Sequence, residues 1–185
     1  MNVYDFDNTV IRGDSSFLFY VWCLRRHPKI VRRLPGVAYH AVKYLKKDKQ
    51  RFKQHMFGYL NDLTDPEKEV SAFWDRNIRR VKPYYMQGKR DDDVIISASP
   101  LFLVAPAMAR LGVKAVIASP VDMRTGVYGG LNCHGKEKVR RFNEEYPYAA
   151  IDGFYSDSLS DAPLARLARI AFLVKGNELL PWPGK

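Results

Sequence analysis

The sequence of 185 residues contains only two cysteines, Cys23 and Cys133, and they lie far apart. Two isolated cysteines provide neither a disulfide framework nor the closely spaced ligands of a zinc site. The chain starts MNVYDF, with no basic segment followed by an apolar one, so we expect no secretory signal. These features predict a protein of the cytoplasm.

The sequence also has no internal repeat and no low-complexity segment. The uncharged runs 15–24 and 34–42 are too short to cross a bilayer, so we expect no transmembrane segment. Hydrophobic residues make up 46% of the chain and aromatic residues 13%, which is enough for a packed core. A chain of this length predicts one compact domain with an insertion rather than two independent domains.

Acidic residues are scarce in one part of the chain. Residues 11–90 contain 19 Lys and Arg but only 7 Asp and Glu, and these residues account for the whole excess of the net charge of +10. Within them, residues 25–53 contain 11 basic residues and a single acid, Asp48. This basic segment therefore faces either an anionic partner or water.

Periodicity and turn residues predict alternating strands and helices, which is typical of an α/β fold with a doubly wound parallel sheet. We expect strands at 2–6, 91–99, 114–119, 149–155 and 170–174, helices at 100–111, 136–145 and 161–169, and a hairpin at 121–132. Residues 15–85 show helical patterning and no strand alternation. They predict a helical insertion after the first strand.

Asp5 and Asp7 follow the first predicted strand in the sequence MNVYDFDNTV. Ligands of open parallel sheets bind at the carboxyl ends of the strands, so both carboxylates can face one crevice there. One carboxylate can ligate a hard cation and attack phosphorus, while its neighbour transfers the proton of the leaving oxygen or of water. Acids at strand ends also serve as caps or turn formers, which is the alternative for this pair.

Three further signals follow strands or begin helices later in the chain. Ser97 ends a predicted buried strand, where its hydroxyl can hold a phosphoryl oxygen. The alternative role for Ser97 is a helix N-cap, but Ser99, directly before Pro100, suits that role better. A lysine near a helix start, Lys138 or Lys136, can neutralise charge on a nucleophile and a phosphate. Two further acids, Asp157 and Asp161, can complete a magnesium site, although Asp161 suits an N-cap equally well.

Together these residues resemble the motifs of the haloacid dehalogenase (HAD) superfamily of phosphohydrolases. DFDNT at 5–9 matches its first motif, Ser97 its second, Lys138 its third and SDSLSD at 156–161 its fourth. The resemblance implies a Rossmann-like core at 1–14 and 86–185 and a type C1 helical cap at 15–85. It implies that Asp5 is the nucleophile, that Asp7 is the general acid and base, and that Ser97 and Lys138 are also catalytic. It further implies that Mg²⁺ is held by Asp5, the Asp7 carbonyl and Asp157. The residues that would support the site are Asp161, Thr9 and Lys136.

Two positions depart from the usual motifs, because Asn8 and Ser156 stand where the superfamily commonly has Gly. Neither change removes a catalytic group. The segment CHGKEKV favours Lys138 over Lys136, and it resembles subfamily IB, which contains phosphoserine phosphatase-like enzymes. The segments RRHPKIVRRLP and NCHGKEKV resemble more closely the phosphatidylglycerophosphatase C type. That resemblance implies an anionic lipid phosphate as substrate.

The basic segment allows three functional interpretations. Each basic residue near an anionic membrane contributes about 1 kcal/mol, so the segment could hold the protein peripherally at the inner membrane surface. A solvated basic cap on a soluble phosphatase for a small metabolite, such as a phosphoserine-like compound, is the main alternative. A module that binds RNA or DNA through its Lys, Arg and Tyr residues is a remote one, because the sequence has no nucleic-acid-binding motif.

Overall fold

The computed structural model describes residues 1–44 and 47–184. These residues contain six strands, which form one sheet in the order β3-β2-β1-β4-β5-β6. The first five strands are parallel and the sixth is antiparallel to β5; their bounds are β1 Asn2–Tyr4, β2 Val94–Pro100, β3 Val116–Ser119, β4 Ile151–Ser156, β5 Ala168–Lys175 and β6 Glu178–Pro181. This arrangement confirms the predicted α/β fold. With β1 between β2 and β4, the strand order reverses beside β1, which is where such sheets bind ligands.

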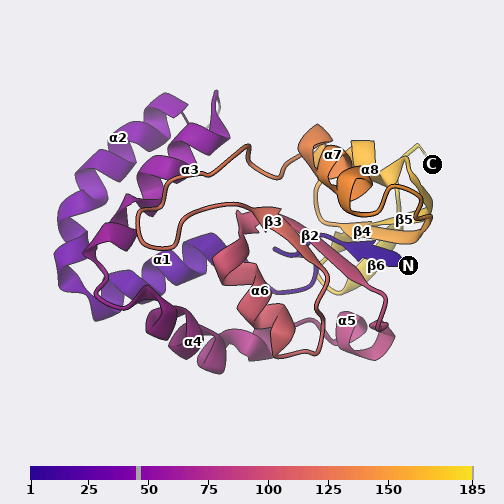
Figure 1. Ribbon diagram of the computed structural model, residues 1–185, viewed down its shortest axis with the longest axis horizontal. Helices are drawn as coiled ribbons and strands as arrows, with labels where there is room; N and C mark the ends of the chain where they lie inside the picture. The colour runs from indigo at the N-terminus through magenta and orange to yellow at the C-terminus, as the bar shows by residue number, and fades with distance from the viewer. Residues whose placement is uncertain (45–46, 185) are drawn as a thin grey trace.

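Helices cover both faces of the sheet (Figure 1). α6 (Leu101–Ala109) packs on one face, and α7 (Lys136–Glu145) and α8 (Ala162–Ala165) pack on the other, where the short helix η4 (Leu159–Asp161) precedes α8. Alternation along β2 explains the two cores: Ile95 joins the cluster on the α6 side, whereas Val94 and Ile96 join the cluster on the α7 side. Burial on both faces is the reason why β2 is a continuous apolar run.

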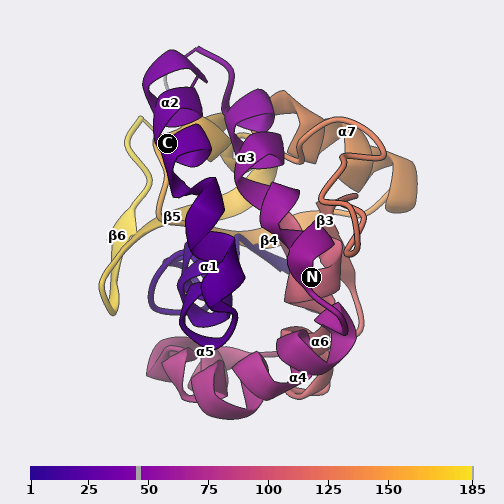
Figure 2. The same cartoon turned by 90° about the vertical axis from the view of Figure 1, so that its left-hand side faces the viewer.

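Between Ser15 and Gly88 the described residues form a series of helices joined by short connections (Figure 2). Asp14, Asp48 and Asp65 cap α1, α3 and α4 by accepting a hydrogen bond from a backbone N–H of the first turn. The helices are α1 Ser15–Arg26, η1 Pro28–Arg33, α2 Leu34–Tyr44, α3 Lys49–Phe57, η2 Gly58–Asp62, α4 Pro66–Asn77, η3 Ile78–Arg80 and α5 Pro83–Gly88.

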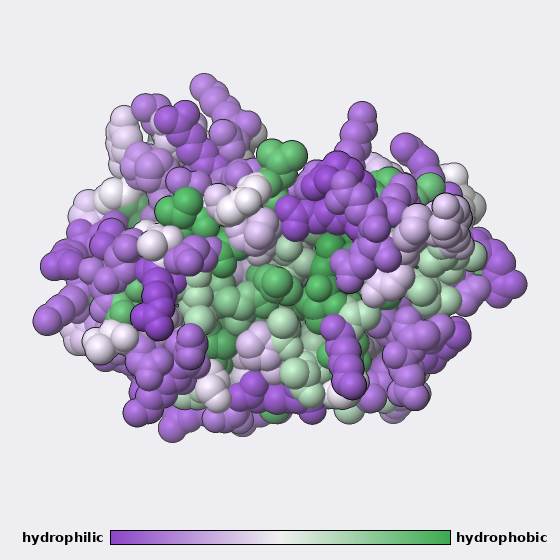
Figure 3. All heavy atoms as spheres, viewed as in Figure 1, coloured by the Kyte–Doolittle hydropathy of each residue, from purple (hydrophilic) through white to green (hydrophobic). Residues whose placement is uncertain are grey.

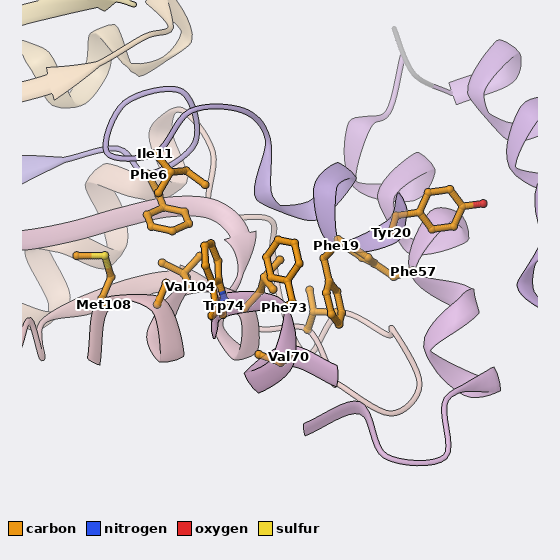
Figure 4. Close-up of a cluster of buried hydrophobic side chains, with 14 of the residues drawn as sticks. Phe6, Ile11, Phe19, Tyr20, Phe57, Val70, Phe73, Trp74, Val104 and Met108 are labelled. Carbon is orange, nitrogen blue, oxygen red and sulfur yellow. The ribbon is translucent and has the colours of Figure 1, made fainter. Parts of the chain in front are cut away.

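These helices share a hydrophobic core with the sheet domain (Figure 4). The cluster joins Phe19 of α1 and Phe73 and Trp74 of α4 to side chains that follow β1 or belong to α6. The Trp74 indole also donates a hydrogen bond of 2.8 Å to the backbone carbonyl of Leu103. α1 and α4 are therefore fixed to the sheet domain, whereas α2 has no buried residue among its described side chains.

Several predicted elements differ from the observed ones. The hairpin predicted at 121–132 is a loop with a single bridge, between Val121 and Tyr128. Gly126 lies in this loop with φ +72°, and a Cβ there would come within 2.5 Å of the Phe57 carbonyl, so the loop packs tightly against the end of α3. The helix predicted at 161–169 is the short α8, because residues from Ala168 onward already form β5. The strand β6 was not predicted.

No described helix has both the length and the apolar character that a membrane span requires. The longest uncharged stretch of the sequence, residues 94–109, is divided between β2 and α6.

Candidate active site

Residues from five distant stretches of sequence line one cavity of about 280 Å³ at the carboxyl ends of the strands. Six of the residues proposed from the sequence are among those that line it: Asp5, Asp7, Ser97, Lys138, Asp157 and Asp161. The lining also includes Lys53 of α3, together with Asn8, Asp14, Ala98, Asn132, His134, Ser158 and Ser160. The sheet topology thus brings together the carboxylates that the sequence suggested would share one crevice.

The loop after β1 carries the two acids and is held in a fixed shape. Asp5 continues the strand, since its backbone N–H donates to the Tyr155 carbonyl at 2.8 Å. Asn8 adopts φ +55°, and its side-chain oxygen accepts a hydrogen bond of 3.1 Å from the Gly13 N–H. Asn is among the residues that tolerate this left-handed conformation, which explains how it replaces Gly here.

Asp7 is held by both of its carboxylate oxygens. Oδ1 accepts a hydrogen bond of 2.7 Å from the N–H of Ser15, in the first turn of α1, and Oδ2 accepts one of 2.5 Å from the Ser99 hydroxyl. The prediction that Ser99 is a helix N-cap is therefore wrong, because Ser99 belongs to β2 and Pro100 is the N-cap of α6. The irregular register of β2 and β3 between Ser97 and Pro100 accompanies this orientation.

Lys138 lies between two carboxylates. Its Nζ is 2.7 Å from Asp5 Oδ1 and 2.7 Å from Asp161 Oδ2, and its side chain is only 2% exposed. Asp161 also accepts a hydrogen bond of 2.8 Å from the Ser156 hydroxyl, so its side chain belongs to this network and does not cap α8. Lys136 is exposed on the first turn of α7 and does not line the cavity.

Thr9 ties the first loop to the fourth. Its side chain is buried, and its Oγ1 accepts a hydrogen bond of 2.9 Å from the backbone N–H of Asp157. Ser97 is also buried, and its hydroxyl oxygen accepts a hydrogen bond of 3.0 Å from the Ser99 N–H. The Ser97 hydroxyl hydrogen is not used in that bond, so it can be donated into the cavity.

Two lysines of the site were not singled out from the sequence. Lys82, just before α5, is 3% exposed, and its Nζ donates to the Asn8 carbonyl. Burial lowers the pKa of Lys82, and the nearby Asp157 opposes that shift. Lys53 of α3 donates a hydrogen bond of 3.1 Å to the Ala98 carbonyl. Both lie in a stretch with many basic residues, so no local pattern distinguishes them.

Burial raises the pKa of three of the carboxyl groups in the cavity lining. The pKa of Asp5 is raised to about 7 by burial, although Lys138 opposes the shift. Burial also raises the pKa of Asp7 to about 6, against the hydrogen bond from Ser99, and it raises the pKa of Asp157. A carboxyl group with a pKa near neutrality can act as an acid and as a base at physiological pH.

Residues 3–166 match the family of haloacid dehalogenase-like hydrolases. The chain belongs to this family. No curated protein matches the sequence.

Solved structures of this hydrolase fold resemble the chain over most of its length. A protein of unknown function from Bordetella pertussis Tohama I has 20% identity and a TM-score of 0.72, with 92% of this chain and 87% of that chain covered. A phosphoserine phosphohydrolase-like protein from Francisella tularensis has 14% identity and a TM-score of 0.55, with coverage of 92% and 86%. A phosphoserine phosphatase in its apo form has 15% identity and a TM-score of 0.54, with coverage of 94% and 86%. At these identities the likeness concerns the fold.

The oxygen donors of this HAD-type site fit a hard divalent cation. Asp5, Asp7 and Asp157 line the same cavity, and their carboxyl groups supply oxygen atoms of the kind that Mg²⁺ binds. Among the described residues no three His, Cys, Asp or Glu side chains are grouped to hold an ion by themselves. Burial disfavours the ionised forms of the Asp5 and Asp157 carboxyls, so a bound cation would offset that cost. This donor set suits Mg²⁺, which normally keeps several water ligands.

Proposed function

We propose that this hydrolase is a magnesium-dependent phosphomonoesterase that forms an aspartyl-phosphate at Asp5, with residues 15–85 as its cap. The observation that carries the proposal is the position of Lys138, buried between Asp5 and Asp161 in the cavity that also holds Asp7. A fixed cation beside one carboxylate orients it and neutralises phosphate charge. The second carboxylate, held by a hydroxyl and a backbone N–H, is placed to transfer a proton.

In the first step an oxygen of the Asp5 carboxylate attacks phosphorus. The new O–P bond forms as the ester O–P bond breaks, and Asp7 donates its proton to the leaving alkoxide. In the second step water attacks the same phosphorus, Asp7 accepts the water proton, and the bond between Asp5 and phosphorus breaks. Inorganic phosphate leaves and both side chains are restored. Lys138 and Ser97 bind the phosphoryl oxygens, and Mg²⁺ supplies further positive charge at the phosphate.

The cavity favours a substrate with a small polar group beside the phosphate. Of the described residues that line it, only Ala98 lacks a polar side chain, and the volume of about 280 Å³ leaves room for a small group beyond the phosphate. Lys53 reaches the cavity from α3, and so carries positive charge from the cap to the substrate. A soluble metabolite phosphate fits these features.

A lipid phosphate remains a second candidate substrate because of an apolar hollow on the same molecule. Hydrophobic side chains gather over α6 and the segment after β3 (Figure 3). Leu101, Phe102, Val121, Val127 and Tyr128 are among the residues that line this hollow. Its lining begins at Leu101, three residues after Ala98 of the catalytic cavity, and its apolar side chains suit an acyl segment.

Phosphate release from a panel of monoesters tests the proposal. We expect turnover of at least one of phosphoserine, glycerol 3-phosphate and dihexanoyl phosphatidic acid with Mg²⁺, and a fall of about 100-fold or more when EDTA removes the metal. Adding excess Mg²⁺ should restore the rate. If no monoester is hydrolysed with Mg²⁺ present, the proposed activity is wrong; the preferred ester distinguishes a metabolite from a lipid.

The pKa of Asp7 predicts a pH dependence that varies with the leaving group. Since burial raises this pKa from 3.8 to about 6, the protonated acid is abundant near pH 6 and declines as the pH rises above it. An alkoxide needs that proton to leave, whereas p-nitrophenolate does not. We therefore expect the ratio of alkyl phosphate to p-nitrophenyl phosphate turnover to increase as the pH falls from 8 to about 6.

Asp7→Asn is the matched control for this ratio. Asn cannot donate the proton, so the variant should lose alkyl phosphate turnover far more than the first-step release of p-nitrophenolate. A ratio that does not change with pH in the native protein would contradict the assignment of Asp7 as the acid.

A further inference from the structure

A second cavity, of about 370 Å³, lies between α1 and α4, which pack side by side (Figures 1 and 2). Its lining shares no residue with the catalytic cavity. The polar part of the lining consists of Arg25, Arg26, Arg76, Arg80 and Asn77, and the apolar part of Leu18, Val21, Trp22 and Phe73. Among these described residues there is no Asp or Glu, so four guanidinium groups surround one cavity without an acid in its lining.

Buried partners hold two of the lining side chains in place. Glu69 of α4 is 8% exposed, and its Oε2 accepts hydrogen bonds of 3.0 Å from the Trp22 indole and 2.9 Å from Arg26 Nε. The other oxygen of Glu69 lies 3.1 Å from His27 Nε2. Burial would raise the pKa of Glu69, but the hydrogen bonds from Arg26, Trp22 and His27 lower it. The negative charge of Glu69 is therefore already paired behind the cavity.

Further contacts in the cavity wall orient Arg80, Arg26 and Arg76. Arg80 Nε donates a hydrogen bond of 3.0 Å to Asn77 Oδ1. The guanidinium groups of Arg26 and Arg76 lie over the Trp22 ring, 5.1 and 5.8 Å from its centroid. Such cation–π contacts keep the guanidinium groups close together without neutralising them. Contacts in the wall therefore orient three of the four guanidinium groups of the cavity.

The chemistry of the lining restricts the ligand. Guanidinium groups bind phosphate oxygens in a bidentate manner. Arg26 is already paired with Glu69, but the cluster of four arginines still favours a phosphate over a single carboxylate. The apolar side chains beside them favour a ligand that also carries a hydrocarbon segment. A flat aromatic ring stacked on Trp22 would compete with the guanidinium groups of Arg26 and Arg76, so a nucleobase fits less well.

We propose that the cavity between α1 and α4 is a binding site for an alkyl phosphate, meaning a phosphate group joined to a short apolar chain. An anionic phospholipid and a free amphiphilic phosphate share this chemistry. The site gives part of the basic segment a specific ligand, and it does not depend on the phosphatase activity of the other cavity.

Dihexyl phosphate is a suitable probe because it is a diester and not a substrate for monoester hydrolysis. Its binding can be measured by calorimetry and by tryptophan fluorescence. Trp22 should give the fluorescence change because it lines the cavity, whereas Trp74 and Trp182 are buried and do not line it. The double variant Arg25→Ala/Arg76→Ala should bind about tenfold more weakly or worse. Both side chains are exposed, so the variant should keep the native melting temperature.

The matched control is Lys29→Ala/Lys68→Ala, which removes two positive charges from exposed positions of the same helical segment outside the cavity. We expect the control to bind dihexyl phosphate as the native protein does, and inorganic phosphate to bind more weakly than dihexyl phosphate. Equal binding by the two double variants, no binding to the native protein, or equal binding of inorganic phosphate would each overturn the proposal.

Vesicle sedimentation then separates the two sources of the ligand. If the ligand is a membrane lipid, the native protein and the control Lys29→Ala/Lys68→Ala should sediment with phosphatidylcholine vesicles that contain phosphatidylglycerol. Much less of the variant Arg25→Ala/Arg76→Ala should sediment with the same vesicles. Binding of dihexyl phosphate without this difference between the variants supports a free amphiphile as the ligand.

Discussion

Asp5→Asn should abolish phosphate release and leave the protein folded. The amide oxygen is a much weaker nucleophile than a carboxylate, so no O–P bond forms at this position. Removal of a nucleophile that acts within a group of catalytic residues commonly costs about 10⁴-fold or more in turnover. We expect a loss of that size in a phosphate-release assay with Mg²⁺, because Asp5 is the carboxylate that Lys138 holds in the cavity.

The fold should tolerate this change because Asn has nearly the same shape as Asp. Burial raises the pKa of Asp5, so the ionised carboxylate costs stability at neutral pH, and Asn removes that cost. Lys138 keeps its second partner, Asp161. A melting temperature close to that of the native protein, measured by circular dichroism, would show that lost activity is not lost folding. Turnover within about tenfold of the native rate would contradict the assignment.

Lys138→Ala should cause the largest loss of stability of any single substitution in the site. The lysine is buried between Asp5 and Asp161, and its removal leaves two buried carboxyl groups without their cation. The two carboxylates raise the pKa of Lys138 even though its burial acts in the opposite direction, so the lysine is charged at all ordinary pH values. Breaking such a buried pair commonly costs about 3–5 kcal/mol. Phosphate release should be lost as well.

The loss of stability in Lys138→Ala should depend on pH. Without the lysine, the pKa of Asp5 in the folded state rises further above its raised native value. The additional cost therefore appears as the pH rises above about 7, the pKa of Asp5 in the native protein, and it is greatest at alkaline pH. Urea denaturation at pH 5 and pH 8 measures this difference.

Lys136→Ala is the matched control for this substitution. Lys136 is exposed on the same helix, and it does not line the cavity, so its loss should leave both stability and turnover close to native values. A loss as great as that of Lys138→Ala would show that the general charge of α7, and not the buried lysine, supports the site.

The sequence located the acids of the site because their positions follow from local pattern and topology. Asp5 and Asp7 follow β1 and Asp157 follows β4, and parallel neighbouring strands bring such positions to one edge of the sheet. Helical periodicity likewise predicted the helices between β1 and β2. The choice between Lys136 and Lys138 depended on the likeness to a motif, and the structure places only Lys138 at Asp5.

Other parts of the site depend on packing between distant segments. Ser99 contacts Asp7 because β2 is irregular beyond Ser97, and nothing in the residues SASP indicates that irregularity. Lys82 and Lys53 reach the site only through the way in which α5 and α3 dock. The shared core of α1, α4 and α6 was also not predicted, because helical periodicity shows which face is apolar but not which partner covers it.

That shared core limits how the site can open. Separation of α1 and α4 from α6 would expose Phe19, Phe73 and Trp74 and would break the hydrogen bond from Trp74 to Leu103. The apolar surface of these aromatic side chains makes that separation costly, at about 25 cal/mol for each Å² exposed. α2, which has no buried residue among its described side chains, has no such constraint.

The most direct test of the account is to find where phosphate attaches to the protein. Asp7→Asn, mixed with a p-nitrophenyl phosphate substrate and Mg²⁺ and quenched rapidly in acid, should accumulate the covalent species because its second step lacks the base. Mass spectrometry of the digested protein should then find one phosphoryl group on the peptide that contains Asp5, and none in Asp5→Asn/Asp7→Asn. Phosphate release without any phosphorylated Asp5, or a phosphoryl group on another residue, would contradict the central claim.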